Sequence, residues 1–385
     1  MRKSIEIQGF CDERFNTAKQ IFTKNFQLGL EIGASFAVVL DGKLLVDLWG
    51  GYADAAQTKP WDKDTIVNVF STTKVMTALC IHILADRGLI DLDAPVAKYW
   101  PEFAQAGKEN LPVRYLLSHT AGLPGFDKEI TVDVLYDWNQ TVNLLAAQKS
   151  WWKPGSRSGY HSITFGFLLG EIIRRVTGKS VGTFFKEEVA QPLNIDFHIG
   201  LSEKDQSRVA EILPPDDSIS KFKMFLFKLL FKTTYKVMFN PVLLNEDFNS
   251  PIWRAAEIPA SNGHGNARSI AKVGAIMACG GKFDNKQILS FSAIENAIKE
   301  QIHGRDKVIF RQPKSWGLGF GLSHDIYLQG PRSFYWSGLG GSYCIMDLEK
   351  KLSIGYAMNK MRLFDEPRGE SLAQAVWDVI NSDGT

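Results

Sequence analysis

Segments with the pattern of β-strands stand near both ends of this chain, while segments with the pattern of helices fill its middle. Residues 34–40 and 43–49 are apolar β-runs joined by Asp41-Gly42, a pair typical of two-residue hairpin turns. Residues 342–348 and 351–358 form a second predicted hairpin. Because strands must pair, the simplest fold is one antiparallel sheet built from both ends, with a mainly helical part inserted between them.

This α/β arrangement divides the 385 residues into two predicted domains. Residues 1–70 and 270–385 form the sheet domain, which carries predicted terminal helices at 12–26 and 370–380. Residues 71–269 form the mainly helical domain. The chain is long enough for two domains or for one large two-lobed fold.

The composition excludes several classes of function. Apolar residues make up 45% of the chain and charged residues 22%, as in an ordinary globular protein, and the net charge of +2 indicates no nucleic-acid partner. No cysteine or histidine spacing is typical of a metal site, and we expect no cofactor. The cysteines are far apart in the sequence: Cys11, Cys80, Cys279 and Cys344.

The N-terminal residues and the hydropathy of the chain bear on its location. The first residues lack the apolar segment of a signal peptide, and no apolar run is long enough for a membrane-spanning helix. We therefore expect a cytoplasmic protein without stable membrane insertion. The sequence leaves the oligomeric state open.

One serine stands apart by its surroundings. Ser71 follows the apolar run Val67–Phe70 and opens a long helix-patterned segment, with Lys74 one turn further on the same face. A serine hydroxyl needs a neighbouring proton acceptor to become a nucleophile, and a partly buried lysine can supply one. The S-x-x-K spacing recurs by chance in other contexts, at Ser150, Ser218, Ser220 and Ser269.

Residues 218–240 are rich in both phenylalanine and lysine. As a single helix, they would carry lysines on one face and apolar residues elsewhere, and the lysines of that face are Lys221, Lys228, Lys232 and Lys236. Two interpretations stay open. The segment packs on the body with its lysines toward solvent, or it is a lid that lines an apolar substrate pocket or touches a membrane surface.

Two further stretches, 151–162 and 335–342, join Ser71-Thr72-Thr73-Lys74 in an ordered set. Together they resemble the three motifs of the serine β-lactamase and penicillin-binding protein superfamily. The resemblance runs from about residue 30 to 360 and is greatest to the class C-like branch and its family VIII carboxylesterases. Further landmarks of that branch are residues 116–124, 191–193, 263–268 and 316–320.

The resemblance implies a β-lactamase-like fold and a role for each motif residue. Ser71 would be the nucleophile that forms an acyl-enzyme. Lys74 would hold Ser71, and Tyr160 would be the general base, its phenolate favoured by the Lys74 ammonium. The backbone N–H groups of Ser71 and Leu339 would form the oxyanion hole, with Gly338 contributing as backbone. His119, in a Gly/Pro loop, is predicted to fix backbone rather than to act in a triad.

Two departures from the family pattern indicate the substrate. Where β-lactamases carry the lysine of K-T-G, this chain has Trp336, which offers apolar surface instead of a charge for a lactam carboxylate. Where Y-x-N has asparagine, this chain has Ser162. We expect Trp336, Gly338, Ser162 and Trp151 to contact substrate. These changes favour neutral acyl esters over anionic lactams.

The sequence therefore predicts a serine carboxylesterase that acts on a small-molecule ester with a short to medium acyl chain. Two alternatives remain at this point. The first is a β-lactamase, D-aminopeptidase or amide hydrolase of the same fold. The second is a non-catalytic binding or assembly module, although Ser71, Lys74 and Tyr160 are all retained.

Overall fold

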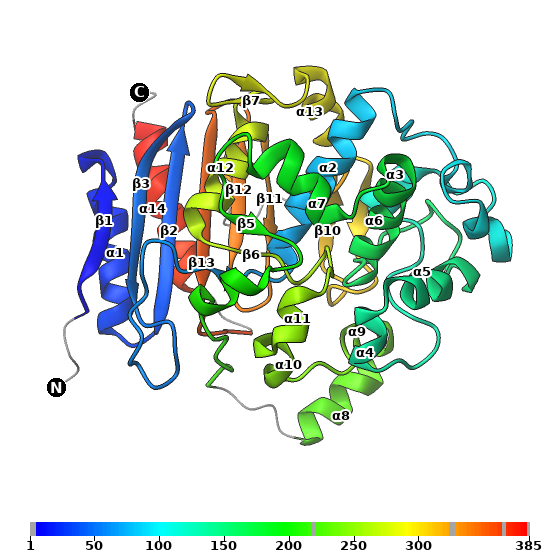
Figure 1. The fold of residues 1–385 in the computed structure, drawn as a ribbon, viewed down its shortest axis with the longest axis horizontal. Coiled ribbons are helices and arrows are strands. Elements are labelled where there is room, and N and C mark those ends of the chain that lie inside the picture. The colour runs from blue at the N-terminus through cyan, green and yellow to red at the C-terminus, as the bar shows by residue number, and fades with distance from the viewer. Residues whose placement is uncertain (1–4, 217–220, 323–327, 364–366, 383–385) are drawn as a thin grey trace.

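A six-stranded antiparallel sheet lies at the centre of the protein, in a computed structural model that describes residues 5–216, 221–322, 328–363 and 367–382. The strand order is β1-β3-β2-β13-β12-β11, so strands from both chain ends share one sheet (Figure 1). This confirms the predicted sheet. The strands are β1 (Ile7–Cys11), β2 (Gly33–Leu40), β3 (Lys43–Gly51), β11 (Ser333–Ser337), β12 (Tyr343–Asp347) and β13 (Leu352–Met358).

The two predicted hairpins form, and they meet at the centre of the sheet. Asp41 and Gly42 have φ angles of 46° and 74°, as a type I′ turn requires at both of its central positions. Strand β2 then pairs with β13, from Ala34 opposite Met358 to Leu40 opposite Leu352. This one pairing joins the N-terminal and C-terminal parts of the sheet.

Each face of the sheet is covered by helices. Helices α1 (Asn16–Gln27) and α14 (Pro367–Ser382) pack on one face and α12 (Ala267–Ala278) on the other (Figure 1). Side chains alternate accordingly along β2, because successive residues of a strand point to opposite faces. Helix α12 lies very close to the sheet, since a Cβ on its Gly274 would be 2.2 Å from Ser353 Oγ.

The helical part of the chain shares its core with that second face. The apolar cluster that includes Ala37 and Val39 of β2 continues into α2 (Lys74–Asp86) and α6 (Thr164–Thr177). Every residue of α2 from Lys74 to Leu84 is buried. The division into two domains stays a prediction. Further helices are α3 (Val113–Leu117), α4 (Val132–Tyr136), α5 (Trp138–Ala147), α7 (Val181–Phe185), α10 (Asn245–Asn249), α11 (Pro251–Ala255) and α13 (Phe291–Ala297).

Short strand pairs complete the fold around the large sheet. Strands β4 (Val67–Asn68) and β5 (Phe197–His198) flank β6 (His264–Gly265) in a three-stranded sheet. Strand β4 ends at Asn68, shortly before Ser71, so its pairing with β6 helps to fix the turn that carries this serine. The remaining pairs are β7 (Lys282–Phe283) with β8 (Lys286–Gln287) and β9 (Ile302–Arg305) with β10 (Pro313–Trp316).

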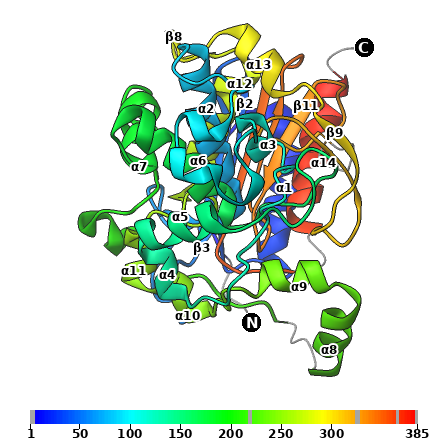
Figure 2. The same cartoon turned by 90° about the vertical axis from the view of Figure 1, so that its right-hand side faces the viewer.

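The prediction of one continuous helix over 218–240 is wrong in the described part of that segment. Residues 218–220 lie outside the described residues, and α8 (Lys221–Leu230) and α9 (Lys232–Met238) follow. Phe231 between them has φ −122° and ψ 53°, which ends the helical backbone. A single lysine face therefore cannot run through both helices. Figure 2 shows α8 projecting away from the body.

Candidate active site

A strained turn presents Ser71. Phe70, the residue before it, has φ 46° and ψ −131°, a conformation that is rare for a bulky side chain. Hydrogen bonds hold the turn on both sides, because Val69 N–H donates to the Gly263 carbonyl and Thr73 Oγ1 donates to the Phe70 carbonyl at 2.6 Å. A 3₁₀ turn over Ser71–Thr73 then continues into α2, as the sequence predicts.

The three predicted catalytic side chains meet at the Ser71 hydroxyl. Lys74 Nζ lies 3.2 Å from Ser71 Oγ, and Tyr160 Oη donates a hydrogen bond to the same oxygen at 2.7 Å. Lys74 Nζ also donates to the carbonyl of Ala260, at 3.0 Å. Ala260 was not foreseen, because a backbone acceptor leaves no mark in the side-chain pattern.

Burial sets the protonation of this group. Lys74 is fully buried, which lowers its pKa well below the ordinary value of 10.5, because a charged amine is poorly solvated there. Burial also raises the pKa of Tyr160, and the hydrogen bond with Ser71 offsets only part of this effect. Burial thus shifts both pKa values toward the neutral forms, and the expected pair of a Tyr160 phenolate and a Lys74 ammonium stays a prediction.

His119 is the centre of an aromatic group behind Tyr160. It is fully buried, and its Nδ1 accepts the backbone N–H of His161 at 3.1 Å. Burial lowers its pKa well below 6.5, which favours the neutral ring. This backbone contact matches the predicted role of His119. The rings around it, with centroids 4.7–5.5 Å away, belong to Tyr160, His161, Phe165, Trp316 and Trp336.

The third motif is bonded directly to the Ser71 turn. Ser342 Oγ donates to the Val69 carbonyl at 2.8 Å and lies 3.0 Å from Thr72 Oγ1. Gly338 approaches so closely that a Cβ there would be 2.2 Å from the Val69 oxygen. In the described part of the chain, the N–H groups of Ser71 and Leu339 donate to no protein acceptor, so both remain available to an oxyanion.

The four residues expected to contact substrate lie in different places. Trp336 is only 4% exposed and packs against Tyr160, with ring centroids 5.9 Å apart, so it has little surface left for a substrate. Gly338 packs on the Ser71 turn, and Ser162 is half-buried just beyond Tyr160. Trp151 is bonded elsewhere, because its Nε1 donates to Asp127 Oδ1 at 2.6 Å. Contact of these four with substrate stays a prediction.

Asp306 is the main residue of the site that the sequence did not indicate. Its buried carboxylate accepts the backbone N–H of Tyr160 at 3.0 Å through Oδ1. The same oxygen accepts the N–H groups of Val308 and Ile309, and Oδ2 accepts Trp316 Nε1 at 3.2 Å. Asp306 therefore fixes Tyr160 to the loop that follows β9. A single aspartate in a loop carries no pattern from which this could be inferred.

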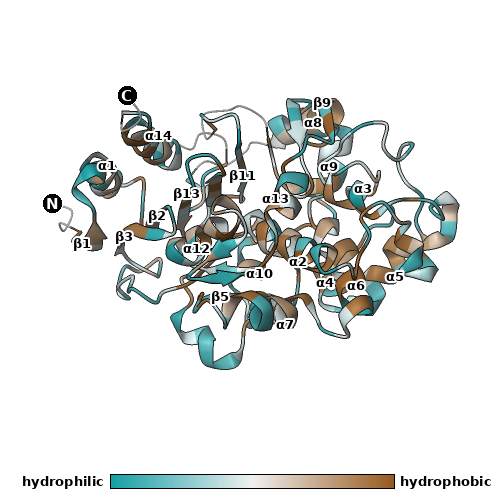
Figure 3. Cartoon of the chain, turned by 90° about the horizontal axis from the view of Figure 1, so that it is seen from above, coloured by the Kyte–Doolittle hydropathy of each residue, from teal (hydrophilic) through white to brown (hydrophobic). Residues whose placement is uncertain are grey.

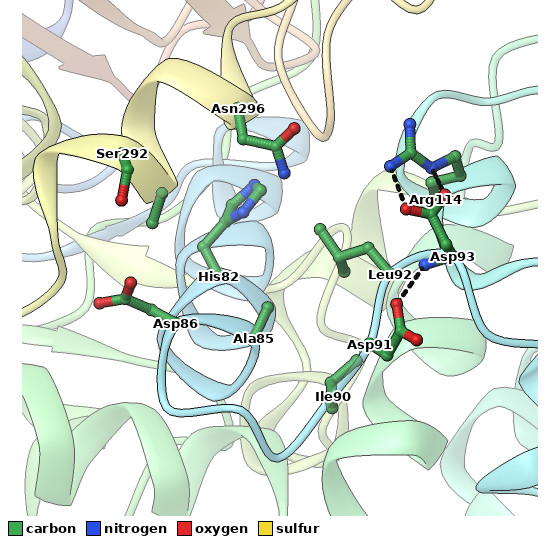
Figure 4. Close-up of a pocket in the computed structure, with 11 residues that line it drawn as sticks. His82, Ala85, Asp86, Ile90, Asp91, Leu92, Asp93, Arg114, Ser292 and Asn296 are labelled. Atoms are coloured by element: carbon green, nitrogen blue, oxygen red, sulfur yellow. Dashed lines mark hydrogen bonds and ion pairs between the residues drawn. The ribbon is translucent and has the colours of Figure 1, made fainter.

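A separate polar hollow of about 410 Å³ lies between the second half of α2, the loop after it and α13 (Figure 4). Arg114 in its wall pairs with Asp93, with Nε 2.6 Å from Oδ1. His82 in the same wall has its pKa lowered to about 4 by burial, and its Nε2 lies 2.8 Å from the Leu318 carbonyl. Ser71, Lys74 and Tyr160 are not among the residues that line it, so it is no part of the serine site.

Comparison with known proteins places this geometry in a family. A family model described as Beta-lactamase matches residues 22–376. The chain is 35% identical to the esterase/β-lactamase LipL of Mycobacterium tuberculosis over 365 residues, which are 92% of this chain and 83% of that protein.

Solved structures agree over the whole length. A family VIII carboxylesterase is 42% identical, with a TM-score of 0.90 over 97% of this chain and 100% of that chain. A penicillin-binding protein homologue from Caulobacter crescentus is 37% identical, with a TM-score of 0.88 over the same shares. The antiparallel sheet from both chain ends, the serine at the start of a buried helix and these matches agree, and the chain belongs to the β-lactamase family.

Proposed function

We propose that this protein is a serine carboxylesterase that cleaves neutral esters through an acyl-enzyme on Ser71. The observation that carries this proposal is the meeting of Lys74 Nζ and Tyr160 Oη at Ser71 Oγ, at 3.2 and 2.7 Å. Similarity to proteins described as esterases supports the same activity. In this proposal Lys74 and Tyr160 both act on Ser71, as predicted, but Lys74 rather than Tyr160 accepts the Ser71 proton.

In the first step, Ser71 Oγ attacks the ester carbonyl and its proton moves to Lys74 Nζ. A neutral lysine can accept that proton, and the lowered pKa of Lys74 keeps it neutral over a wider pH range. The Ala260 carbonyl then stabilises the resulting ammonium through its hydrogen bond. Tyr160, with its raised pKa, keeps its proton and donates to the serine oxygen.

The tetrahedral intermediate carries a negative charge on the former carbonyl oxygen. The N–H groups of Ser71 and Leu339 would bind this oxygen, and one such donor is worth about 3–4 kcal/mol in other hydrolases. When the intermediate collapses, the ester C–O bond breaks and the alkoxide leaves as an alcohol. Its proton comes from Lys74 Nζ, which accepted it from Ser71 in the first step.

The second half of the reaction repeats these steps with water. Lys74 accepts a proton from the water that attacks the acyl carbonyl, and the C–O bond to Ser71 breaks. Ser71 takes the proton back, and the carboxylic acid leaves. One ester and one water thus give one acid and one alcohol, with the enzyme unchanged.

The residue at position 336 favours neutral substrates. A lysine there would attract an anionic substrate, since two unit charges about 4 Å apart gain about 4 kcal/mol at an effective dielectric constant of 20. Trp336 forgoes this attraction and instead packs with Tyr160 and Phe165 around Lys74, whose Nζ is 5.9 Å from the indole ring centre. Lactam hydrolysis at the same serine is the second candidate function, because the similar protein LipL is described as an esterase/β-lactamase and a similar structure as a penicillin-binding protein homologue.

A substrate panel separates the two functions. Purified protein would be given p-nitrophenyl esters of increasing acyl length beside nitrocefin and benzylpenicillin. We expect kcat/KM for p-nitrophenyl butyrate to exceed that for benzylpenicillin by orders of magnitude, and a fluorophosphonate probe to label Ser71. Equal rates on the two substrates would refute the ester preference, while labelling at another serine would refute the proposed nucleophile.

A further inference from the structure

Helix α8 presents apolar side chains to solvent. Phe225 and Leu229 are 65% and 54% exposed, and the adjacent pair Leu226 and Leu230 are 42% and 57% exposed. Each pair is spaced by four residues, so the two pairs form neighbouring rows on one side of the helix. We call Phe225, Leu226, Leu229 and Leu230 the apolar face of α8. The orientation is opposite to that of an ordinary surface helix, which turns such a face inward.

Aromatic packing on the other side fixes this orientation. Phe227 points inward, and its ring centroid lies 5.6 Å from that of Phe231 and 5.9 Å from that of Phe310. Tyr235 and Phe239 of the α9 region contact it as well, at 6.4 Å. Turning the apolar face inward would remove Phe227 from this cluster. The exposure of the apolar face is therefore part of the folded arrangement.

The same segment is strongly cationic. From 221 to 239 the sequence contains five lysines and no aspartate or glutamate. Lys223 and Lys228 of α8 and Lys232 of α9 are exposed, and Lys228 Nζ also lies 4.9 Å from the centre of the Tyr235 ring. Lys236 pairs with Asp127 at 3.3 Å and thus holds α9 to the body.

From this combination we infer that α8 docks on the surface of an anionic lipid bilayer. Phenylalanine and leucine side chains enter the boundary between headgroups and acyl chains, while lysines beside them bind anionic headgroups. In the described part of the chain no helix is long and apolar enough to cross a membrane. Binding would therefore be peripheral and reversible.

A second copy of the chain fits this surface less well. In a two-fold symmetric contact the same patch meets itself, so lysines of one copy would face lysines of the other. Such like-charge contacts oppose association. An anionic bilayer matches both the apolar face and the charge, and it is the partner that the surface favours.

The lipid-binding surface is connected to the serine site through one loop. Thr234 of α9 donates to the Val308 carbonyl at 2.7 Å, and Phe310 of the same loop packs on Phe227 and Phe231. Asp306, at the start of that loop, bonds the backbone of Tyr160. A bilayer bound at α8 would thus lie next to an element that holds a catalytic-site residue. The lipid proposal does not depend on the ester chemistry, since its test needs no turnover.

The test is co-sedimentation of the full-length protein with lipid vesicles. Vesicles of phosphatidylcholine alone are compared with vesicles that also contain phosphatidylglycerol, at low and high salt. We expect binding to the anionic vesicles at least about tenfold tighter than to the neutral ones, and weakened by salt, because each lysine near the surface adds attraction. Failure of the wild-type protein to bind anionic vesicles would overturn the proposal.

Paired variants identify the surface. Phe225→Ser with Leu229→Ser should reduce anionic vesicle binding about tenfold or more, whereas Leu28→Ser with Leu89→Ser, which are similarly exposed elsewhere, should leave it unchanged. Lys228→Glu with Lys232→Glu should remove the preference for anionic vesicles, unlike Lys282→Glu with Lys299→Glu. Thermal unfolding checks that each variant is folded. Equal loss in test and control pairs, or a dimer that the serine pair dissolves without any vesicle binding, would refute lipid docking.

Discussion

Lys74 and Phe225 each lie where their residue type is normally not found. The amine of Lys74 is fully buried beneath Ser71, and the phenyl ring of Phe225 is largely exposed on α8. Burial of an amine is unfavourable unless it has hydrogen-bond partners, and an exposed phenyl ring gains none of the free energy that its burial would supply. Proteins retain such local conflicts mainly where function needs them. The two regions therefore mark the two places where this chain acts on something other than itself.

The two conflicts are resolved differently. Inside the protein, burial lowers the pKa of Lys74, and its amine has hydrogen-bond partners in Ser71 and Ala260. On α8, nothing in the described part of the chain covers Phe225 or Leu229, and each such side chain would contribute about 1.5–3 kcal/mol if it were fully buried. The buried amine of Lys74 is thus stabilised by partners within the fold, whereas the apolar face of α8 would be stabilised by the proposed bilayer.

The largest expected effect comes from the centre of the buried region. Ser71→Ala should lower kcat/KM by a factor on the order of 10⁴ or more, because no acyl-enzyme can form. Unfolding temperature should stay within a few degrees, since only one oxygen is removed. The matched control is Ser150→Ala, which alters another S-x-x-K serine, one whose Oγ donates to the Ala121 carbonyl. Loss of turnover in Ser150→Ala instead of Ser71→Ala would show that Ser71 is not the nucleophile.

Next in size is the replacement of the buried amine. Lys74→Met keeps an unbranched side chain only one atom shorter and should lower kcat/KM about 10²–10⁴-fold, as expected for loss of a proton acceptor. In the wild type, kcat/KM should rise with pH as Lys74 loses its proton. Tyr160, whose pKa is raised, should keep its proton across that rise. A pH–rate profile of both proteins tests this, and an unchanged profile in the variant would exclude Lys74 as the acceptor.

Lys74→Met should also change how stability depends on pH. The folded-state pKa of Lys74 lies below 10.5, so between these two values the unfolded chain binds more protons than the folded one. The free energy of unfolding should therefore rise with pH across that window, by at most about 1.4 kcal/mol per pH unit from this group. Chemical denaturation at several pH values would show this slope in the wild type and its loss in the variant.

A smaller effect is expected at the loop that links the two regions. Asp306→Asn replaces one carboxylate oxygen by a donor that faces backbone N–H groups or Trp316, which should cost about 1–3 kcal/mol of stability. Because Tyr160 is displaced only slightly, kcat should fall about tenfold with little change in KM. Asp284→Asn, on an exposed turn, is the control. A rise in KM alone would argue against a positioning role.

The smallest effect belongs to the exposed face. Phe225→Ser with Leu229→Ser should change the free energy of unfolding by less than about 0.5 kcal/mol, as for other exposed positions. Hydrolysis of water-soluble esters should be equally little affected at every acyl length. Chemical denaturation and the p-nitrophenyl panel measure both. A loss of several kcal/mol would mean that α8 packs inward and that the contrast with Lys74 is false.

Local sequence signals predicted most of the fold and the centre of the site. Asp41-Gly42 indicated the hairpin, and the spacing of Ser71 and Lys74 placed both on one face at the start of a helix. Tyr160 was identified from the order of the three motifs along the chain. These features depend on neighbours in sequence or on a chemical pattern, and both are visible in the chain itself.

Features that depend on the surroundings were not predicted. The outward side of α8 depends on the packing of Phe227 on Phe310, a contact across 83 residues, and the helix break at Phe231 lies beside this contact. The raised pKa of Tyr160 follows from burial, and the role of Asp306 from its approach to a distant backbone N–H. Residue type alone does not give the depth of a side chain or its remote partners.

The bond between Thr72 and Ser342 spans 270 residues, and it has a consequence for the time at which activity appears during synthesis. Ser71 leaves the ribosome early, but Ser342, which completes its turn, is made about 270 residues later. Contacts so far apart in sequence also form late and slowly during folding. A nascent chain in which α2 has formed thus contains Ser71 but lacks the Ser342 contact that completes its turn. We therefore expect hydrolysis only after the N-terminal and C-terminal parts of the chain have paired in the sheet.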